Sequence, residues 1–345
     1  MFLKEVHRLR AIAIFIVVST HCLPLFKMQG DGWAMALFHS LITNGTVYFM
    51  FIAGLLFEHQ SVKFRFYPYL KKKLHYVIIP YVVVSMPVLL IDAIQGSGIF
   101  NPADAHHWPT LFQNVVAALL SGAIIEPPFW FIPMIAVFYL LAPALLWITR
   151  LRYFGILLPV TVILASFSHR PTALDHVWQS FPYFLPAYLY GMWFRTNYSR
   201  LIEWHTRWLP SLIVLAVGLR WFEIVILHQN GVVFSQTLFS QEHSVIDIDV
   251  YFKLLTSGIF LVGLRHAGSL IGRVLDYLAE LSFGIFFLHI YVIVAFQHVL
   301  RGTIAVGFGA VFLLVTASLV TVLCIPILWS VRTGFGRNSR VLVGC

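Results

Sequence analysis

The first apolar stretch of the chain carries two residues, Arg10 and His21, whose types and spacing suit joint chemistry. They are eleven residues apart, which in an α-helix is three turns plus about 20°, so both side chains lie on one face with a rise of about 16 Å between them. A guanidinium at the entrance to the membrane suits an anion such as phosphate, because its planar fork matches phosphate geometry. An imidazole about halfway across suits proton transfer or nucleophilic attack, since its pKa lies near neutrality. The alternatives are a snorkelling arginine that only sets topology and a histidine that only hydrogen-bonds a neighbouring helix.

A second histidine, His289, lies in a later apolar stretch, at a depth of roughly 18 Å that is similar to that of His21. Two histidines at one depth can share a site, and simple helix packing is the alternative. Arg220 and Glu223 stand three residues apart in another apolar stretch. This spacing favours a structural ion pair between them over a catalytic role.

Basic and aromatic residues alternate in the loop 58–75. Its cations are Lys63, Arg65, Lys71, Lys72 and Lys73, and its interleaved aromatic residues are Phe64, Phe66, Tyr67 and Tyr69. This composition suits the phosphates and adenine of a nucleotide-like donor, and it suits anionic lipid head groups equally well. Trp130 lies at the start of a further apolar stretch, where an aromatic residue is usually an anchor at the membrane interface.

These side chains need a scaffold, and the composition of the chain indicates a membrane protein. The 345 residues are 59% hydrophobic and 11% charged, with a mean hydropathy of +0.84, whereas a soluble domain is about a quarter charged. A disordered protein is excluded, and a soluble enzyme is not expected. The net charge of +9 is explained by basic cytoplasmic loops rather than by nucleic-acid binding. The cysteines form no C-x-x-C pair and the histidines are scattered, so no metal site is expected.

The apolar stretches predict an all-α fold, a polytopic membrane helix bundle with about ten transmembrane helices. The predicted spans are 10–27, 34–57, 76–99, 129–149, 154–168, 181–195, 209–227, 250–264, 277–299 and 303–330. A shorter stretch, 111–125, precedes Pro127 and is expected to be a partial helix. No long polar segment interrupts these spans, so residues 1–345 are expected to form a single transmembrane domain without a separate soluble domain.

The distribution of basic residues predicts the orientation of the bundle. With the N-terminus in the cytoplasm, 18 of the 23 Lys and Arg residues fall in inside segments. The outside segments contain Lys27, Arg170 and Arg301, while Arg220 and Lys253 fall within spans. Because the cytoplasmic loops of membrane proteins collect Lys and Arg, both termini are predicted to be cytoplasmic.

Five segments form an ordered pattern over about residues 8–290. The first is the pair Arg10 and His21, and the others are NGTVYFMFIAG (44–54), KKKLHYVIIPY (71–81), FWFIP with YLLAP (129–143) and LSFGIFFLH (281–289). The pattern resembles the acyltransferase 3 family of membrane O-acyltransferases, which carries an R-x10-H signature in its first helix. Two positions depart from the family pattern. Ala53 replaces a serine, and Tyr76 stands where a second arginine is expected, which leaves Lys73 as the matching cation.

The resemblance implies an enzyme, an O-acetyltransferase that moves an acyl group, commonly acetyl, from cytoplasmic acyl-CoA to a sugar hydroxyl. In this enzyme His21 acts as general base or transient acyl carrier, with Arg10 and His289 as further catalytic residues. The residues expected to bind the acyl-CoA donor are Arg10, Lys72, Lys73 and Trp130.

The expected partners follow from the same resemblance. Acetyl-CoA is a donor substrate, so no tightly bound cofactor is expected, and the acceptor is expected to be a polysaccharide or an undecaprenyl-linked sugar. The expected location is the lipid bilayer of the bacterial plasma (inner) membrane, as a multi-pass protein without a nucleic-acid partner. The rival interpretation is a polytopic transporter or glycan export component without acyl-transfer chemistry, because buried Arg, Glu and His suit that function too.

Overall fold

The computed structural model describes residues 3–28, 33–95, 108–122, 124, 128–171, 177–235, 246–300, 304–306 and 309–344. Most of this described chain is helical, which confirms the predicted all-α membrane bundle. It also contains two short parallel strand pairs, β1 (Phe26–Met28) with β4 (Ile304–Val306) and β2 (Arg170–Pro171) with β3 (Phe234–Ser235). Pro127 and Arg301 lie outside the described residues.

The α-helices follow the predicted apolar stretches closely. Those of the first half are α1 (Lys4–Cys22), α2 (Trp33–Ile42), α3 (Thr46–Gln60), α4 (Phe66–Lys73), α5 (Ile79–Gln95), α6 (Trp108–Ser121), α7 (Phe131–Leu140), α8 (Ala142–Thr149) and α9 (Phe154–Phe167). Those of the second half are α10 (Val177–Thr196), α11 (Tyr198–Arg207), α12 (Leu209–Trp221), α13 (Asp249–Arg265), α14 (Ser269–Leu300), α15 (Gly309–Phe335) and α16 (Ser339–Leu342). A π-helical turn, Leu74–Ile78, joins α4 to α5.

Every predicted span contains a helix, but not every helix is long enough to cross a bilayer. In the described chain, six helical segments have the length and apolarity for a crossing, and α7 with α8 would make a seventh although the two meet at 63°. A crossing needs about 20 helical residues, whereas α9 has 14 and α13 has 17. The predicted count of about ten spans is therefore not confirmed, while a multi-pass membrane protein is supported. The predicted partial helix at 111–125 corresponds to α6.

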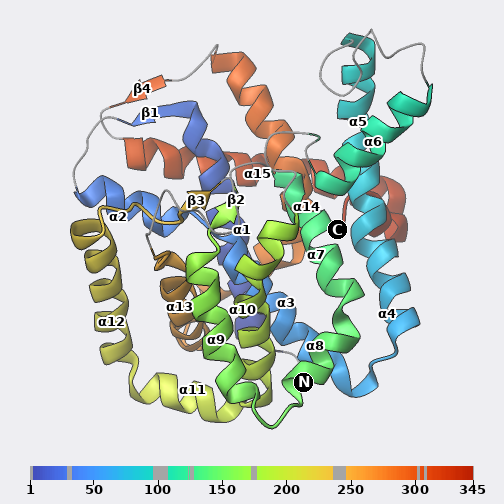
Figure 1. Cartoon of the computed structure of the whole chain (residues 1–345). Coiled ribbons are helices and arrows are strands. Elements are labelled where there is room, and N and C mark those ends of the chain that lie inside the picture. The colour runs from blue at the N-terminus through green and yellow to red at the C-terminus, as the bar shows by residue number, and fades with distance from the viewer. Residues whose placement is uncertain are drawn as a thin grey trace.

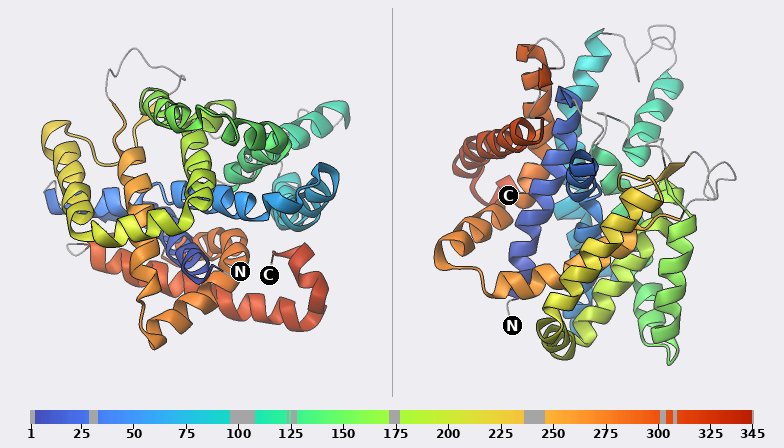
Figure 2. Two further views of the ribbon diagram at one scale, coloured as in Figure 1. Left: turned by 90° about the horizontal axis from the view of Figure 1, so that it is seen from below. Right: turned by 90° about the vertical axis from the view of Figure 1, so that its left-hand side faces the viewer.

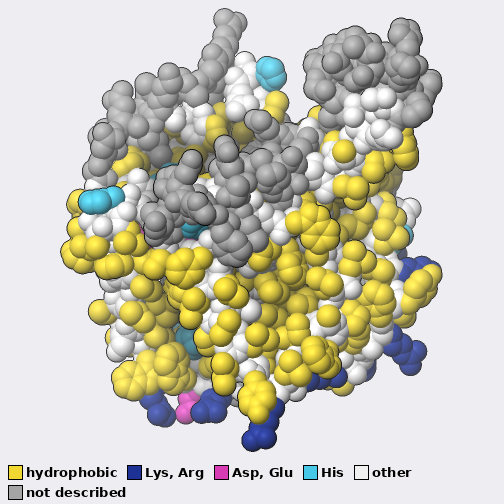
Figure 3. Space-filling view, in the orientation of Figure 1, with side chains coloured by type: hydrophobic (Ala, Val, Ile, Leu, Met, Phe, Trp, Pro, Cys, Tyr) yellow, Lys and Arg dark blue, Asp and Glu magenta, His cyan; other side chains and the backbone are white. Residues whose placement is uncertain are grey.

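The helices α10 and α12 rise from the lower end of the molecule, and α11 joins them there (Figure 1). The helices α2 and α15 lie across this direction, and α3 is inclined to it (Figure 1, Figure 2). Hydrophobic side chains cover the middle of the face seen in Figure 3. Lys and Arg side chains gather at its lower rim, where Figure 1 places the N-terminus. An apolar belt with one basic end is the surface expected of a bilayer-embedded protein.

The first helix, α1, lies between two hydrophobic clusters, with Leu9 packed in one and Ile14 and Val18 in the other. It contacts α3, α13, α14 and α15. Since apolar side chains hold α1 from several directions, its rotation about its own axis is fixed. The directions of Arg10 and His21, which this helix carries, are fixed with it.

Two glycines permit a close crossing of α3 and α10. A Cβ atom added to Gly54 would overlap with the backbone of Tyr188, and one added to Gly191 would overlap with the backbone of Phe51. Small residues at such crossings let helix backbones approach within a membrane. The crossing matters for the site because α3 begins directly after the loop that borders His21.

We expect Gly54→Val to lower the free energy of unfolding by about 1–3 kcal/mol, because the added atoms force the two backbones apart. Gly155→Val in α9 is the matched control, since nothing lies within 4 Å of a Cβ at that position. Thermal unfolding of the purified variants in detergent measures the difference. Equal midpoints for the two variants would contradict a tight crossing at Gly54.

Candidate functional site

Two histidines from distant parts of the chain meet inside the bundle. His21 lies in the last turn of α1 and His289 lies in α14, and their ring centroids are 5.3 Å apart. The two imidazoles therefore share one location, as their similar predicted depths allowed.

The hydrogen bonding of His289 leaves one ring nitrogen free. Its Nδ1 lies 3.0 Å from the Ile285 carbonyl oxygen, and because a carbonyl only accepts, Nδ1 is the donor in the neutral ring. The buried Nε2 finds no hydrogen-bond partner among the described residues. His289 therefore presents an unpaired lone pair beside His21, which is the form of imidazole that accepts a proton.

A cavity of about 30 Å³ adjoins His21. Its polar lining consists of Thr20, His21, Asn44, Thr46, Trp130 and Arg170. Its apolar lining includes Val17, Phe49 and Phe286. Val17 lies one helical turn before His21 on α1, and Phe286 lies about one turn before His289 on α14. The volume suits one or two waters, so a substrate requires the surrounding side chains to move apart.

The loop between α2 and α3 places Asn44 at this cavity. Asn44 has a positive φ of 55°, which asparagine tolerates better than most residues. Its amide nitrogen donates to the Tyr183 hydroxyl at 2.9 Å and to Asp249 Oδ2 at 2.6 Å. Its Oδ1 is buried and finds no partner among the described residues. Asn44, a residue of the cavity lining, thus has an unpaired acceptor.

Arg170 and Trp130 form the other side of the cavity. The Arg170 guanidinium carbon lies 4.7 Å from the Trp130 ring centroid, and Phe184 stacks on Trp130 with a centroid distance of 5.6 Å. Arg170 is held by β2, whose backbone pairs with β3 more than sixty residues later. Sequence reasoning placed Arg170 among the outer-loop cations and gave it no role, because nothing local indicates that its strand folds back toward His21.

A second group of charges surrounds Arg10. The charge of Arg10 repels those of Lys73 and Arg340, so the three cations lie within electrostatic range. The Lys73 ammonium also lies 4.7 Å from the Tyr139 ring centroid and 5.4 Å from that of Tyr69. We refer to Arg10, Lys73 and Arg340 as the cation cluster.

The predicted donor-binding residues divide between two places. Arg10 and Lys73 belong to the cation cluster, whereas Lys72 is exposed on α4 and Trp130 lies at the histidine cavity. The cavity lining includes no member of the cation cluster. The structure therefore contains two sites, a cationic one and an imidazole one, on the single continuous helix α1.

Comparison with known proteins identifies the chain. A family model described as an acyltransferase domain, that of the acyltransferase 3 family, matches residues 3–330. The chain belongs to the acyltransferase 3 family. The resemblance stated from the five ordered segments is thereby confirmed, and the protein is a membrane acyltransferase.

Several curated proteins are similar to this acyltransferase. They are named "Probable poly-beta-1,6-N-acetyl-D-glucosamine export protein" and include those of Staphylococcus aureus strains MSSA476, MW2 and MRSA252. Each is 24% identical over 312 residues, which is 83% of this chain and 81% of the relative. No solved structure matches.

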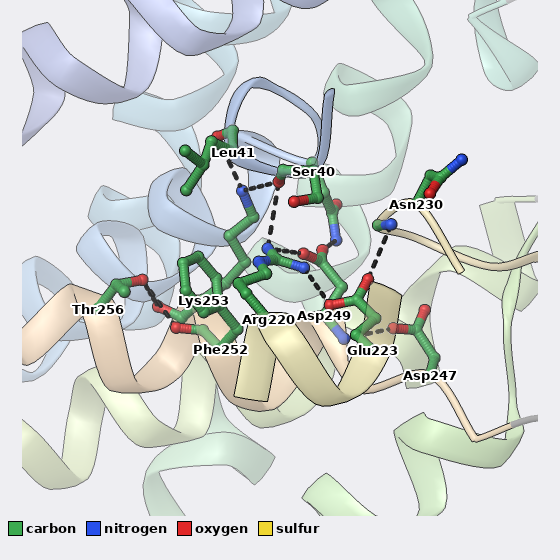
Figure 4. A network of polar contacts seen from close by, with 12 residues as sticks. Ser40, Leu41, Arg220, Glu223, Asn230, Asp247, Asp249, Phe252, Lys253 and Thr256 are labelled. Atoms are coloured by element: carbon green, nitrogen blue, oxygen red, sulfur yellow. Dashed lines mark hydrogen bonds and ion pairs between the residues drawn. The ribbon is translucent and has the colours of Figure 1, made fainter. Parts of the chain in front are cut away.

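Next to the imidazole site, the acyltransferase contains a buried ionic network (Figure 4). Arg220 forms ion pairs with Glu223 and with Asp249, and its Nη2 donates to the Ser40 carbonyl at 3.1 Å. Lys253 donates to the same carbonyl at 3.3 Å. The predicted pair of Arg220 and Glu223 is confirmed, and Asp249 is the partner that sequence spacing did not indicate. Because Asn44 also bonds Asp249, this network supports the loop beside the cavity.

A larger cavity, of about 900 Å³, opens near the N-terminal end between α1, α11 and the end of α13. Its cations include members of ion pairs: Arg8 binds Asp276 through two hydrogen bonds of 2.9 and 3.1 Å, and Arg207 lies 3.4 Å from Glu203. Neither histidine of the pair lines it, whereas His21 lines the smaller cavity. The smaller cavity is therefore the candidate site for chemistry.

Proposed function

We propose that this acyltransferase transfers an acyl group, acetyl in the first instance, from acyl-CoA to a hydroxyl of a surface glycan or a lipid-linked sugar. The observation that carries the proposal is the contact of His21, which lines a polar cavity, with His289, whose buried Nε2 has no partner among the described residues. The name of the Staphylococcus aureus relatives supports a polysaccharide as the acceptor class.

The donor is assigned to the N-terminal end of the bundle. In the proposed topology both termini face the cytoplasm of a bacterial inner membrane. The basic lower rim in Figure 3, where Figure 1 places the N-terminus, supports this orientation for the N-terminal end. Arg10 and Lys73 hold the phosphates of acyl-CoA, and Lys72 adds positive charge on the exposed side of α4. The pantetheine arm then extends about 16 Å along α1 to bring the thioester to His21, where Trp130 borders the acyl group.

The chemical step at His21 is acyl transfer to oxygen. The imidazole takes the proton of the acceptor hydroxyl, the oxygen attacks the thioester carbonyl carbon, the C–S bond breaks, and the CoA thiolate leaves and is reprotonated by the imidazolium. The covalent variant has His21 attack first and carry the acyl group to the sugar. In either route, the free Nε2 of His289 is a second proton acceptor next to the reacting ring.

The acceptor is assigned to the opposite side of the cavity. Asn44, which lines the cavity, has a buried Oδ1 without a partner among the described residues. A buried acceptor left unpaired costs about 1–3 kcal/mol, so a sugar hydroxyl that donates to this atom would recover that energy. The Arg170 guanidinium, which lines the same cavity, suits an acceptor with acidic groups or phosphate.

The alternative function is glycan export without acyl transfer, which the name of the Staphylococcus aureus relatives favours. Transfer of label from acetyl-CoA to glycan in membranes that contain the chain separates the two functions. Label in the glycan supports the acyltransferase reaction. Normal glycan export without labelling would favour export alone.

We expect Arg10→Ala to raise the KM for acetyl-CoA by about 10- to 100-fold, because a charge-assisted hydrogen bond to phosphate contributes about 1.5–3 kcal/mol. Arg10→Lys keeps the charge but loses the planar fork, so its KM should lie between those of the wild type and of Arg10→Ala. Initial rates in reconstituted membranes over a range of acetyl-CoA concentrations measure the effect. An unchanged KM in Arg10→Ala would remove Arg10 from the donor site.

A further inference from the structure

The cation cluster brings together like charges from three separate parts of the chain. Arg10 comes from α1, Lys73 from the end of α4, and Arg340 from the C-terminal helix α16. Among the residues that the structure describes, no ion pair joins any of the three to a carboxylate. Arg10 therefore lies within range of two other cations, Lys73 and Arg340, and is not paired with a carboxylate. This is a costly arrangement, and at a membrane protein site such charges usually serve a ligand. The ligand that this arrangement fits is an anion.

Packing holds Arg340 in this position. Its guanidinium carbon lies 4.8 Å from the ring centroid of Tyr76, and α16 packs against α5 and the π-helical turn Leu74–Ile78. Ser339, the neighbour of Arg340, is buried. A cation stacked on an aromatic face is stabilised by about 0.5–1 kcal/mol at an exposed site. The exposed Arg340 side chain is thus directed by Tyr76 rather than free in solvent.

The contact of Arg340 with Tyr76 lies at a position where the sequence departs from the family pattern. Tyr76 occupies the residue at which the segment 71–81 departs from its family pattern, where a second arginine is expected. Tyr76 itself supplies no guanidinium. Arg340, 264 residues later in the chain, places its guanidinium over the Tyr76 ring. Arg340 also lies beyond the end of the family match at residue 330.

We propose that Arg340 is a donor-binding residue that completes a phosphate site with Arg10 and Lys73, and that Tyr76 is the platform that orients it. The proposal rests on the proposed function, since it takes the phosphates of acyl-CoA as the ligand. Phosphate on an anionic lipid head group has the same chemistry, so the test must distinguish the two sources. The proposal also assigns a role to the C-terminal segment that the family match does not reach.

Equilibrium binding of radiolabelled CoA tests the site without requiring catalysis. The full-length protein is reconstituted in nanodiscs of phosphatidylcholine, with and without phosphatidylglycerol. We expect Arg340→Ala to raise the Kd for CoA about tenfold or more in phosphatidylcholine alone. Arg337→Ala, which removes an exposed cation three residues earlier, should leave the Kd within about twofold of the wild type. A Kd in Arg340→Ala equal to that of the wild type would overturn the proposal.

The double variant Tyr76→Arg with Arg340→Ala is the decisive arm. It moves the guanidinium from α16 to the platform position, and we expect it to recover most of the CoA affinity. Failure to recover CoA affinity in a folded double variant would overturn the proposal. So would an effect of Arg340→Ala on phosphatidylglycerol retention with CoA binding unchanged, since the site would then serve lipid. If CoA binding depends on Arg340 but no acyl transfer is detected, the proposed phosphate site is supported and the proposed acyl-transfer reaction is refuted.

Discussion

Replacing His21 by alanine is expected to lower acyl transfer to the glycan by about 10²- to 10⁴-fold, which is the usual contribution of a general acid–base group. The half-buried imidazole lines the polar cavity and contacts His289, so its loss removes the base or nucleophile without removing a hydrogen bond on which the fold depends. The amount of protein in the membrane should be unchanged. The measurement is incorporation of label from acetyl-CoA into polysaccharide, normalised to the amount of protein. Full activity in His21→Ala would show that His21 is neither the base nor the nucleophile.

A second histidine provides a control for the same experiment. His289 and His205 are both buried, and in each the Nδ1 atom lies near the carbonyl oxygen four residues earlier, at 3.0 and 2.7 Å. The His289 ring contacts that of His21, whereas the His205 ring contacts those of Phe194 and Trp204. His289→Ala should therefore lower the rate of transfer by about tenfold or more, while His205→Ala should affect the stability of the protein and not the rate per folded molecule. Equal rates per folded molecule in the two variants would make His289 a packing residue.

The second large effect is expected from Asp249→Asn. Asp249 is a buried ion-pair partner of Arg220, with Lys253 also buried nearby. Breaking a buried pair by removing one partner costs about 3–5 kcal/mol, because an uncompensated charge is left behind. We expect the variant to be depleted from membranes and to unfold at a much lower temperature in detergent.

Asp247→Asn is the matched control. Asp247 lies two residues earlier and is also buried, but desolvation by burial and the neighbouring Asp249 raise its pKa to about 8. At pH 7 this carboxyl is mostly protonated, so asparagine breaks no ion pair. It should lower the free energy of unfolding by about 1–3 kcal/mol, less than Asp249→Asn, because the amide nitrogen cannot accept from the Val233 N–H that donates to Asp247 Oδ2. If Asp247→Asn and Asp249→Asn were equally destabilising, the ion pair with Arg220 would not be the source of the effect.

The same group predicts a pH dependence. In the unfolded chain the Asp247 carboxyl ionises near about 4, whereas in the folded protein it ionises near about 8. The unfolded state therefore holds fewer protons between these values, so the wild type should lose stability as pH rises from about 4 to about 8. Asp247→Asn should show a shallower decline over this range. Parallel stability curves for the two proteins would refute the raised pKa.

Local patterns predicted the parts of the site that depend on one helix. The eleven-residue spacing of Arg10 and His21 placed them on one face of what is a continuous helix, and the three-residue spacing of Arg220 and Glu223 gave their ion pair. Apolar periodicity located the helices because each is built from contiguous residues. The number of membrane crossings was harder to predict. Short helices such as α9 and bent pairs such as α7 with α8 are as apolar as helices that cross a membrane, so composition alone does not distinguish them.

Contacts between segments that are far apart in the sequence could not be predicted from residue spacing or composition. Arg170 reaches Trp130 because β2 pairs with β3, and Arg340 reaches Tyr76 because α16 folds back on the start of α5. Neither pairing has a signal in spacing or composition. The departure at Tyr76 was visible in the sequence, but only the packing of the C-terminal helix shows which cation lies over it.

The central claim, acyl transfer at the histidine pair, is tested most directly by linkage-resolved analysis of surface-glycan O-acetylation in cells that contain the wild-type chain, no chain, or His21→Ala. The amount of exported glycan is measured in the same samples. We predict that O-acetyl esters are present with the wild type and absent in the other two, while His21→Ala leaves glycan on the surface. Loss of exported glycan in His21→Ala, with O-acetylation of the intracellular glycan intact, would contradict the claim.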